Sequence, residues 1–563
     1  MASIIKKIKK GRPYYYAAES KRVDGKPRIV WQKYLGTIDA IVERAEKSKP
    51  AKPKETVIFE AGGVAALLRI AQRLRLIELI DEVVPKRDQG PSVGQYMILA
   101  ALNRALAPCS KLKIGDWYEE TVLRRLWRFA KSAFSSQRFW DHMGLLSQEA
   151  IETIQDRLVP HIEKEFGIDP RILLYDATNF FTFIATSNTR NSISQRGHSK
   201  AKRHDLKQVG LALLVTRDFQ IPLFHNAYPG NVADVTVFSR LSGDLVARHK
   251  KAAAACREAT LVFDKGNVSD NNMEELVVSG TRFVAALPLN RFPELAKIPL
   301  DQFEETSAFP ATRAFTSQVE LWGARCLGVV TYTESFFTQQ LSGITQNLVQ
   351  CQKKLMDLEK RLRRWQEGKG RGKKPSLRNV KKNVNRALGA QFMKELFDIN
   401  VTEEKGLPRL QYALNHETLG RISNERLGRT LLVTNHLEWT GNDVIDAYRS
   451  LTAIENVFKN MKNVDYLRWQ PSYHWTDQKL KVHAFYCVMA VLLANLARKI
   501  AVESGIDLSL HELISELTTI REVALIYPKG VLAHPKDHIT LSRMSPRQRK
   551  LAECLQISDV LGG

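Results

Sequence analysis

The sequence predicts an α/β protein whose core is a mixed β-sheet with helices packed against it. Three apolar runs of strand-like composition follow one another from residue 168: "RILLYDATNFFTFIA", "LKQVGLALLVT" and "QIPLFHNAYPG". Two further runs, "ATLVFDKG" and "TRFVAALP", alternate with helical segments. Three consecutive strands followed by alternating helices and strands are typical of a mixed sheet that carries helices on its faces.

The composition indicates a multidomain protein with a polyanionic partner. At 563 residues the chain is too long for one simple core, so we expect two to four domains. Lys and Arg outnumber Asp and Glu by 84 to 60, which gives a net charge of +24. Such an excess favours binding to nucleic acid or to an anionic membrane surface. The simpler alternative is a basic soluble enzyme.

The membrane alternative has little support in the sequence. The most apolar stretch, 482–497, is shorter than the ~20 residues of a spanning helix, and Lys481 and Arg498 flank it. We expect a buried helix there and no membrane partner. The N-terminus lacks the apolar segment of a secretory signal. The six cysteines form no CxxC pair, which argues for a reducing compartment and against a thiolate zinc site.

The N-terminal third predicts two modules before the sheet. Residues 1–50 alternate basic and aromatic or aliphatic residues, and "VDGK" is a turn signal between two strand-like runs, so we expect a basic β-hairpin module. A Lys- and Pro-rich linker covers 46–55. Residues 55–165 have mostly helical periodicity, with a Ser cap before "VGQYMILAALNRAL", and predict a helical domain.

The sheet itself is expected in two parts. Residues 166–298 contain the five strand-like runs, a helical segment at 234–250 and a Ser-capped helix that ends at Gly280. Residues 441–505 contain a helix predicted over 443–469 and the apolar helix described above. Residues 506–563 are expected to form a C-terminal helical tail.

Between these two parts, residues 299–440 predict a β-rich insertion that carries a helical hairpin over 341–396. Strand-like runs flank the hairpin ("LGVVTYTES" and "GRTLLVTN"). Within it, apolar residues recur at alternating steps of three and four, which is the pattern of a heptad seam. These residues are Leu341, Ile344, Leu348, Cys351, Leu355, Leu358, Leu362 and Trp365. A second helical stretch has Leu377, Val380, Val384 and Leu388 on one face.

The hairpin is strongly basic around its turn, "EGKGRGKKPS". Residues 353–386 contain fourteen Lys or Arg and three Asp or Glu, a net of +11. One interpretation is a solvated charged face. The other is a tip that contacts DNA phosphates, through Lys369, Arg371, Lys373 and Lys374.

Three carboxylates stand out by their positions. Asp176 and Asp264 each end an apolar run, "RILLY" and "TLVF". Each alone could be a cap or a strand-end turn, but two such residues call for a common explanation. Glu455 lies on the predicted helix 443–469, where Tyr448 and Lys462 recur on the same side. An exposed face residue is the simpler interpretation of Glu455 unless that helix packs beside the two strands.

The residues around these carboxylates resemble a known family. An Asp in the first strand, an Asp after the fourth and a Glu on a late helix is the arrangement of ribonuclease-H-like DDE recombinases. The sequence most resembles the DDE transposases of bacterial insertion sequences, in particular the family-four group, whose Tyr-x2-Arg-x3-Glu-x6-Lys motif matches Tyr448, Glu455 and Lys462. Leu451 stands at the Arg position, and Arg449 is close by. "FDKGN", "GHSKAKRHDLKQVGLALL", "PLFHNAYPGNVAD" and "WQPSYHWTDQKLKVHAFYCVMAVLL" resemble further segments of the group, over about residues 170–505.

The resemblance implies a ribonuclease-H-like catalytic core that cleaves and joins DNA with two Mg²⁺ ions, for which Mn²⁺ would substitute. Asp176 would bridge the ions, with Asp264 and Glu455 each holding one. This agrees with the chemistry, because paired Mg²⁺ ions about 4 Å apart can activate the attacking oxygen and neutralise the leaving one. The implied partners are double-stranded DNA with terminal inverted repeats, target DNA and a second copy of the chain. The implied location is the bacterial cytoplasm, in association with the nucleoid.

Tyr448 and several basic residues near the carboxylates are expected to contact DNA phosphates. Besides the cations at the hairpin tip, these are Lys200, Lys202, Arg203, Lys265, Tyr448, Arg449, Lys459 and Lys462. For the loop cations, a solvated basic loop is an equally good interpretation. Two functional alternatives to a transposase stay open: a metal-dependent nuclease of the same fold that does not join strands, and a DNA-binding scaffold without catalysis.

Overall fold

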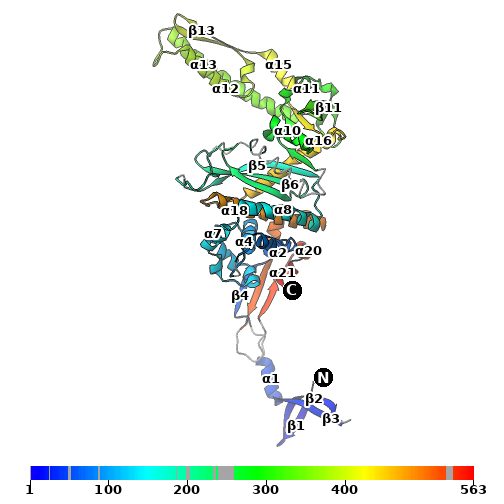
Figure 1. Ribbon diagram of the computed structural model, residues 1–563. Helices are drawn as coiled ribbons and strands as arrows, with labels where there is room; N and C mark the ends of the chain where they lie inside the picture. Colours follow the sequence, from blue (N-terminus) through cyan, green and yellow to red (C-terminus); the bar gives the residue numbers. More distant parts are fainter. Residues whose placement is uncertain are drawn as a thin grey trace. The chain divides into compact units, whose positions relative to one another are not determined.

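The computed structural model (Figure 1) describes residues 2–23, 26–47, 52–86, 89–185, 187–197, 203–232, 236, 238, 259–527 and 537–562. The chain divides into two compact units. One comprises Met1–Ala66, Asp116–Arg128 and His511–Gly563, and the other comprises Leu67–Gly115 and Phe129–Leu510. Most of the predicted helical segment 55–165 belongs to the unit that holds the large sheet, and its boundary at residue 165 stays a prediction.

The larger unit is built on a nine-stranded mixed sheet with the order β10-β11-β12-β15-β9-β8-β5-β6-β7. The five predicted core strands are all present: β5 (Ile172–Thr182), β6 (Lys207–Thr216), β7 (Pro222–Pro229), β8 (Thr260–Phe263) and β9 (Arg282–Leu287). β5, β6 and β7 form an antiparallel meander, whereas β8 is parallel to both β5 and β9. The mixed sheet expected from the strand order is thus confirmed. The helix predicted over 234–250 lies almost entirely outside the described residues.

The strands predicted for a separate β-rich insertion instead extend this same sheet. They are β10 (Glu304–Glu305), β11 (Thr312–Leu321), β12 (Ala324–Thr333) and β15 (Arg429–Thr434). β15 pairs antiparallel with β9, with Leu431 opposite Leu287. The edge of β9 would otherwise leave backbone hydrogen-bonding groups unpaired. The strand-like runs "LGVVTYTES" and "GRTLLVTN" are therefore confirmed as parts of strands, whereas the separation of an insertion from the core at residue 299 stays a prediction.

The segment between β12 and β15 contains the predicted helical hairpin. It comprises α12 (Glu334–Gln366), α13 (Leu377–Ala387), α14 (Met393–Leu396), β13 (Phe397–Glu404), β14 (Leu407–Leu414) and α15 (His416–Glu425). The seam of α12 is buried at Ile344, Cys351, Leu355, Leu358 and Leu362. Its partners include the β13–β14 hairpin as well as α13, because the 11 residues of α13 cover only part of a helix of 33.

Three long helices form the helical layer of this unit: α4 (Val93–Leu106), α8 (Gln148–Phe166) and α18 (Asp477–Glu503). α4 packs against α18 rather than against the sheet. Both α8 and α18 contact β7, and Figure 1 shows them running beneath the strands β5 and β6. α18 is long and apolar enough to cross a membrane by length and composition, but 94% of its most apolar window is buried inside the protein. The prediction of a buried helix is confirmed.

Shorter helices complete the larger unit. The α-helices are α3 (Leu76–Val83), α7 (Ser136–Met143), α10 (Asp270–Val278), α11 (Pro293–Ala296), α16 (Gly441–Arg449) and α17 (Leu451–Met461). The 3₁₀ turns are η1 (Lys131–Phe134), η2 (Lys265–Asn267), η3 (Leu289–Arg291) and η4 (Leu300–Gln302). The predicted Ser cap of α4 is confirmed, since the Ser92 hydroxyl accepts a hydrogen bond from the Gln95 amide.

The smaller unit contains two three-stranded sheets. In the first, β1 (Ala2–Lys9) joins the predicted hairpin of β2 (Arg12–Val23) and β3 (Lys26–Gly36), and α1 (Ile38–Lys47) follows. The two turn residues between β2 and β3 lie outside the described residues. In the second sheet, β16 (Arg521–Ile526) pairs with both β4 (Glu55–Glu60) and β17 (His538–Leu541).

The sequence predicted a helical tail over residues 506–563, but this segment also contains the strands β16 and β17. It does contain α19 (Leu510–Thr518), α20 (Pro546–Cys554) and α21 (Ile557–Leu561). β16, however, finds its partner β4 near the other end of the chain, and a pairing at that separation leaves no local signal. The remaining helices are α2 (Gly62–Arg73), α5 (Ile114–Glu119) and α6 (Leu123–Trp127).

Candidate active site

Asp176 and Asp264 lie on neighbouring parallel strands at the same level of the sheet. The paired register of β5 and β8 ends with Tyr175 opposite Phe263, so each Asp is the next residue along its strand. Adjacent strands are about 4.8 Å apart, and register partners in a parallel pair face the same side. Asp264 keeps an extended backbone, with φ −81° and ψ 161°. The register thus places the two aspartate residues side by side at the carboxyl end of β8.

This register also explains an Asp inside an apolar strand. β5 is longer than β8 and continues to pair with β6, where Asp176 lies opposite Leu213. On its other side β8 has ended, so the Asp176 side chain is only half-buried although its neighbours Tyr175 and Ala177 are buried. A strand held by β6 fixes the backbone of Asp176 while the end of β8 leaves room beside it.

The helix predicted over 443–469 is two helices. α16 ends at Arg449, α17 begins at Leu451, and α17 ends at Met461. At the junction, the Ser450 hydroxyl donates to the Ala447 carbonyl at 2.5 Å and the Thr452 hydroxyl donates to the Arg449 carbonyl at 3.0 Å. Such side-chain bonds compete with the helical ladder and bend helices.

α17 packs against β5, the condition on which a functional interpretation of Glu455 depended. Its buried residues are Ile454, Val457, Phe458 and Met461. Glu455 lies beside this apolar stripe with its side chain exposed.

Tyr448 at the end of α16 connects the carboxylates. Its hydroxyl donates a hydrogen bond to Asp264 Oδ1 at 2.8 Å. Burial, the negative charge of Asp264, this hydrogen bond and the charge of Glu455 all raise the pKa of Tyr448 well above its ordinary value. The tyrosine therefore stays protonated near neutral pH and lies within the electrostatic field of both carboxylates.

Lys462, just after α17, binds the same strand as Asp176. Its Nζ donates to Thr178 Oγ1 at 2.8 Å and lies 5.3 Å from the ring centroid of Phe180. Thr178 is two residues beyond Asp176 on β5, so the two side chains share one face of the sheet. The ammonium group of Lys462 is thus held on the face of β5 that carries Asp176.

Metal binding by the three carboxylates stays a prediction. Within the described ranges, no group of three or more His, Cys, Asp or Glu side chains is close enough together to hold a metal ion. The donor chemistry of Asp176 and Asp264 fits Mg²⁺, which prefers carboxylate oxygens. The hydrogen bond from Tyr448 occupies one acceptor position of Asp264, and a carboxylate has about four. A shared site would require the exposed Glu455 side chain to move toward the two aspartates.

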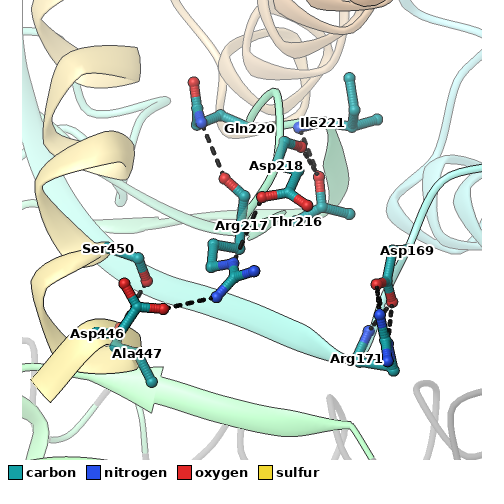
Figure 2. Close-up of polar contacts among 10 residues, drawn as sticks. All are labelled: Asp169, Arg171, Thr216, Arg217, Asp218, Gln220, Ile221, Asp446, Ala447 and Ser450. Carbon is teal, nitrogen blue, oxygen red and sulfur yellow. Dashed lines mark hydrogen bonds and ion pairs between the residues drawn. The ribbon is translucent and has the colours of Figure 1, made fainter. Parts of the chain in front are cut away.

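An ion pair between Arg217 and Asp446 holds α16 to the meander formed by β5, β6 and β7 (Figure 2). Arg217, directly after β6, binds Asp446 Oδ2 at 3.0 Å and Asp218 Oδ1 at 3.4 Å. Asp446 is two residues before Tyr448. Arg217 and Asp218 border a cavity of about 490 Å³ at the amino ends of β5, β8 and β9, the end of these strands away from Asp176. The sequence pattern offered no signal for the ion pair of Arg217 with Asp446, because its partners are far apart in the chain.

Several predicted DNA contacts have protein partners in this structure. The Arg449 guanidinium lies 4.3 Å from the ring centroid of Phe309 and donates to Thr312 Oγ1 at 2.7 Å. Arg203 is paired with Asp205 at 2.7 Å. Lys459 Nζ lies 3.4 Å from Asn456 Oδ1. Lys265, in the turn after Asp264, is exposed. Lys200 and Lys202 lie outside the described residues.

The four tip cations lie in the loop between α12 and α13. Lys369, Arg371, Lys373 and Lys374 are all exposed. Lys369 pairs weakly with Glu367 at 3.7 Å. Gly370 packs on Trp365, since a Cβ at that position would lie 2.1 Å from the indole ring. The loop is therefore folded onto the last seam residue of α12.

A buried aromatic and polar group behind α17 was not found from the sequence. Phe180 on β5 stacks on Trp469, with ring centroids 4.5 Å apart. The Trp469 carbonyl is 2.7 Å from Nε2 of the buried His483 on α18. Burial lowers the pKa of His483 well below its ordinary value, so the ring is neutral. This group fixes the segment that follows Lys462. The apolar spacing of α18 predicted its burial but not the partners of a His within it.

Comparisons with known proteins give limited guidance. No protein-family model matches the chain, and no curated protein matches it. Among solved structures, a piggyBac transposase in a synaptic complex with hairpin DNA is similar with a TM-score of 0.38 and 9% sequence identity, over 80% of this chain and 79% of that one.

Proposed function

We propose that this protein is a DNA transposase that cleaves and joins transposon-end DNA by cut-and-paste transposition. One observation carries the proposal: Asp176 on β5 is level with Asp264 just after β8, and Tyr448 donates a hydrogen bond to Asp264 while the charge of Glu455 also acts on it. The resemblance of the surrounding motifs to DDE transposases of the family-four group supports it. The net charge of +24 suits a DNA substrate.

The three carboxylates would hold two Mg²⁺ ions, or Mn²⁺ in their place. Bound there, the ions would supply activation of an attacking water or 3′-hydroxyl and neutralisation of the leaving oxygen. Asp176, Asp264 and Glu455 would supply the carboxylate oxygens that hold the ions. Tyr448 would orient the Asp264 carboxylate through its hydrogen bond. Lys462, already held over β5, would bind a phosphate next to the scissile one.

The remaining DNA contacts in the proposal are electrostatic. The N-terminal β-hairpin module of residues 1–50 and the helical segment 55–165 would bind inverted repeats at the transposon ends, and the α12–α13 tip would contact phosphates. Because two ends must be held at once, the active form would be a homodimer on DNA. The place of action would be the nucleoid in the bacterial cytoplasm.

A metal-dependent nicking assay on end DNA tests the enzymatic part of this proposal. The wild-type protein should nick in Mg²⁺ or Mn²⁺ and lose activity in a chelator, while Asp264→Asn should be inactive. Asp301→Asn, an exposed carboxylate in η4, is the matched control and should remain active. An inactive wild-type protein that still binds end DNA would favour the scaffold alternative.

A strand-transfer assay with pre-cut ends separates a transposase from a nuclease. The proposal expects covalent joining of the 3′-hydroxyl ends to a target plasmid. Cleavage of intact ends without any joined product would favour the nuclease alternative.

A further inference from the structure

The N-terminal sheet has a hollow face built from three tyrosines and three cations. A cavity of about 910 Å³ is lined by Lys9, Lys10, Arg12, Tyr14, Tyr16 and Tyr34. Register explains why these residues meet: Tyr16 lies opposite Tyr34 on β3, and Arg12 lies opposite Lys9 on β1. Alternate residues of a strand share a face, so Arg12, Tyr14 and Tyr16 all point into the hollow. We call these six residues the tyrosine face.

The rings on this face are close together but not stacked face to face. The centroid of Tyr34 lies 5.2 Å from that of Tyr16, at 54° between planes, and 6.0 Å from that of Tyr14, at 44°. Tyr34 is 50% exposed. Lys7 on β1 contacts both neighbouring strands beside the hollow: its Nζ lies 5.0 Å from the ring centroid of Tyr16 on β2 and donates a hydrogen bond to Gln32 Oε1 on β3. Aromatic surface therefore remains available to a flat ligand.

The charge of the face selects the class of that ligand. Among the described residues that line it, every charged side chain is cationic. Glu19, the acid nearest along β2, is an odd number of residues from Tyr14 and Tyr16 and so lies on the opposite face. Aromatic rings surrounded by Lys and Arg suit a single-stranded nucleic acid, because its flat bases can stack on the rings and its phosphates can pair with the cations.

We propose that the tyrosine face binds unpaired nucleotides of a DNA strand, with bases on the tyrosine rings and phosphates at Lys9, Lys10 and Arg12. This deepens the proposed function, on which its biological role rests, by naming the DNA form this module takes. Unpaired bases suit the site better than a duplex, because bases in a duplex are already stacked on one another and their faces cannot enter a hollow.

The test measures fluorescence anisotropy of the full-length protein with a short fluorescein-labelled oligothymidylate at fixed salt. Each stacked base contributes about 1–3 kcal/mol, so Tyr34→Ala should weaken binding roughly 5- to 150-fold. Tyr34→Phe keeps the ring and should bind like the wild type. Tyr15→Ala, which alters a ring on the opposite face, is the matched control and should change little. Tyr16→Ala should act in the same direction as Tyr34→Ala.

Two results would overturn this proposal. The first is equal binding by Tyr34→Ala and the wild type. The second is equal weakening by Tyr15→Ala and Tyr34→Ala, which would indicate loss of the module's fold. The metal-dependent nicking assay of the wild type, run beside these affinity measurements, separates the two hypotheses. Binding that depends on Tyr34 without any metal-dependent cleavage by the wild type would sustain the tyrosine face and refute the transposase.

Discussion

The Tyr448 hydroxyl donates a hydrogen bond to Asp264 Oδ1 and so joins the end of α16 to the end of β8. The same tyrosine is affected by the charge of Glu455 on the next helix. Asp264 is level with Asp176 on the adjacent strand, so the phenol contacts one of the two paired aspartates and is also affected by the third carboxylate. Its orientation of Asp264 is open to direct test.

Tyr448→Phe removes this hydrogen bond and keeps the ring. A hydrogen bond to a charged group contributes about 1.5–3 kcal/mol, so the rate of end cleavage should fall roughly 10- to 100-fold. DNA affinity should change little, because binding is spread over many phosphate contacts. Single-turnover cleavage and anisotropy together check this. An unchanged cleavage rate would mean that Asp264 needs no support from α16.

The raised pKa of Tyr448 also predicts a pH dependence of stability. A group whose folded pKa lies above its unfolded value contributes stability that is present below the unfolded pKa, about 10 for tyrosine, and is lost as pH rises beyond it. The free energy of unfolding should therefore fall more steeply above pH ~10 in the wild type than in Tyr448→Phe. Denaturant titrations of both proteins between about pH 8 and about pH 11, a range that spans the ordinary pKa of tyrosine, measure the difference in the free energy of unfolding. Parallel curves would contradict it.

Asp176→Ala should abolish cleavage and leave end binding largely intact. The carboxylate is proposed to help hold the metal ions, whereas affinity comes from phosphate contacts on other elements. The matched control is Asp205→Ala, which removes an exposed acid paired with Arg203. Retained Mg²⁺-dependent cleavage by Asp176→Ala, or equal loss of binding and cleavage, would remove Asp176 from the proposed site.

Lys462→Gln tests the cation held over β5. Loss of one phosphate contact should reduce the slope of log affinity against log salt by about one unit and weaken binding uniformly across DNA sequences. Lys462→Arg should restore much of the affinity, since it keeps the charge. If Lys462→Gln instead leaves the salt slope unchanged but lowers thermal stability, the lysine serves only to bind Thr178 and Phe180.

The α12–α13 tip offers a larger electrostatic change. Replacing Lys369, Arg371, Lys373 and Lys374 by Ala should reduce the salt slope on end DNA by a few units, at about 0.9 per phosphate contact. The preference between end sequences should stay the same, because phosphate contacts carry no base readout. Arg409→Ala and Lys394→Ala, which change exposed cations elsewhere in the same segment, form the control. An unchanged slope would leave the hairpin as a protein contact or a spacer.

The sequence by itself determined the elements whose signals are local. The apolar runs around Asp176 and Asp264 predicted strands because their side chains are buried on both faces of the sheet. The seam from Leu341 to Trp365 predicted a long helix because its apolar residues lie on one side at a regular spacing. Apolar residues without charge over 482–497 predicted a buried helix.

Only the tertiary structure decided which of these elements pair. The strands after residue 299 extend the core sheet through β15 and β9, and β16 pairs with β4 from the opposite end of the chain. The helix break at Ser450 accompanies a hydrogen bond from its hydroxyl to the Ala447 carbonyl. The ion pair of Arg217 with Asp446 joins two residues that are far apart in the sequence. Backbone hydrogen bonds and ion pairs between distant segments leave no periodic pattern in the chain. The sequence could therefore identify Asp176, Asp264 and Glu455 only as separate candidates. The register of β5 with β8 and the hydrogen bond from Tyr448 to Asp264 depend on the folded sheet.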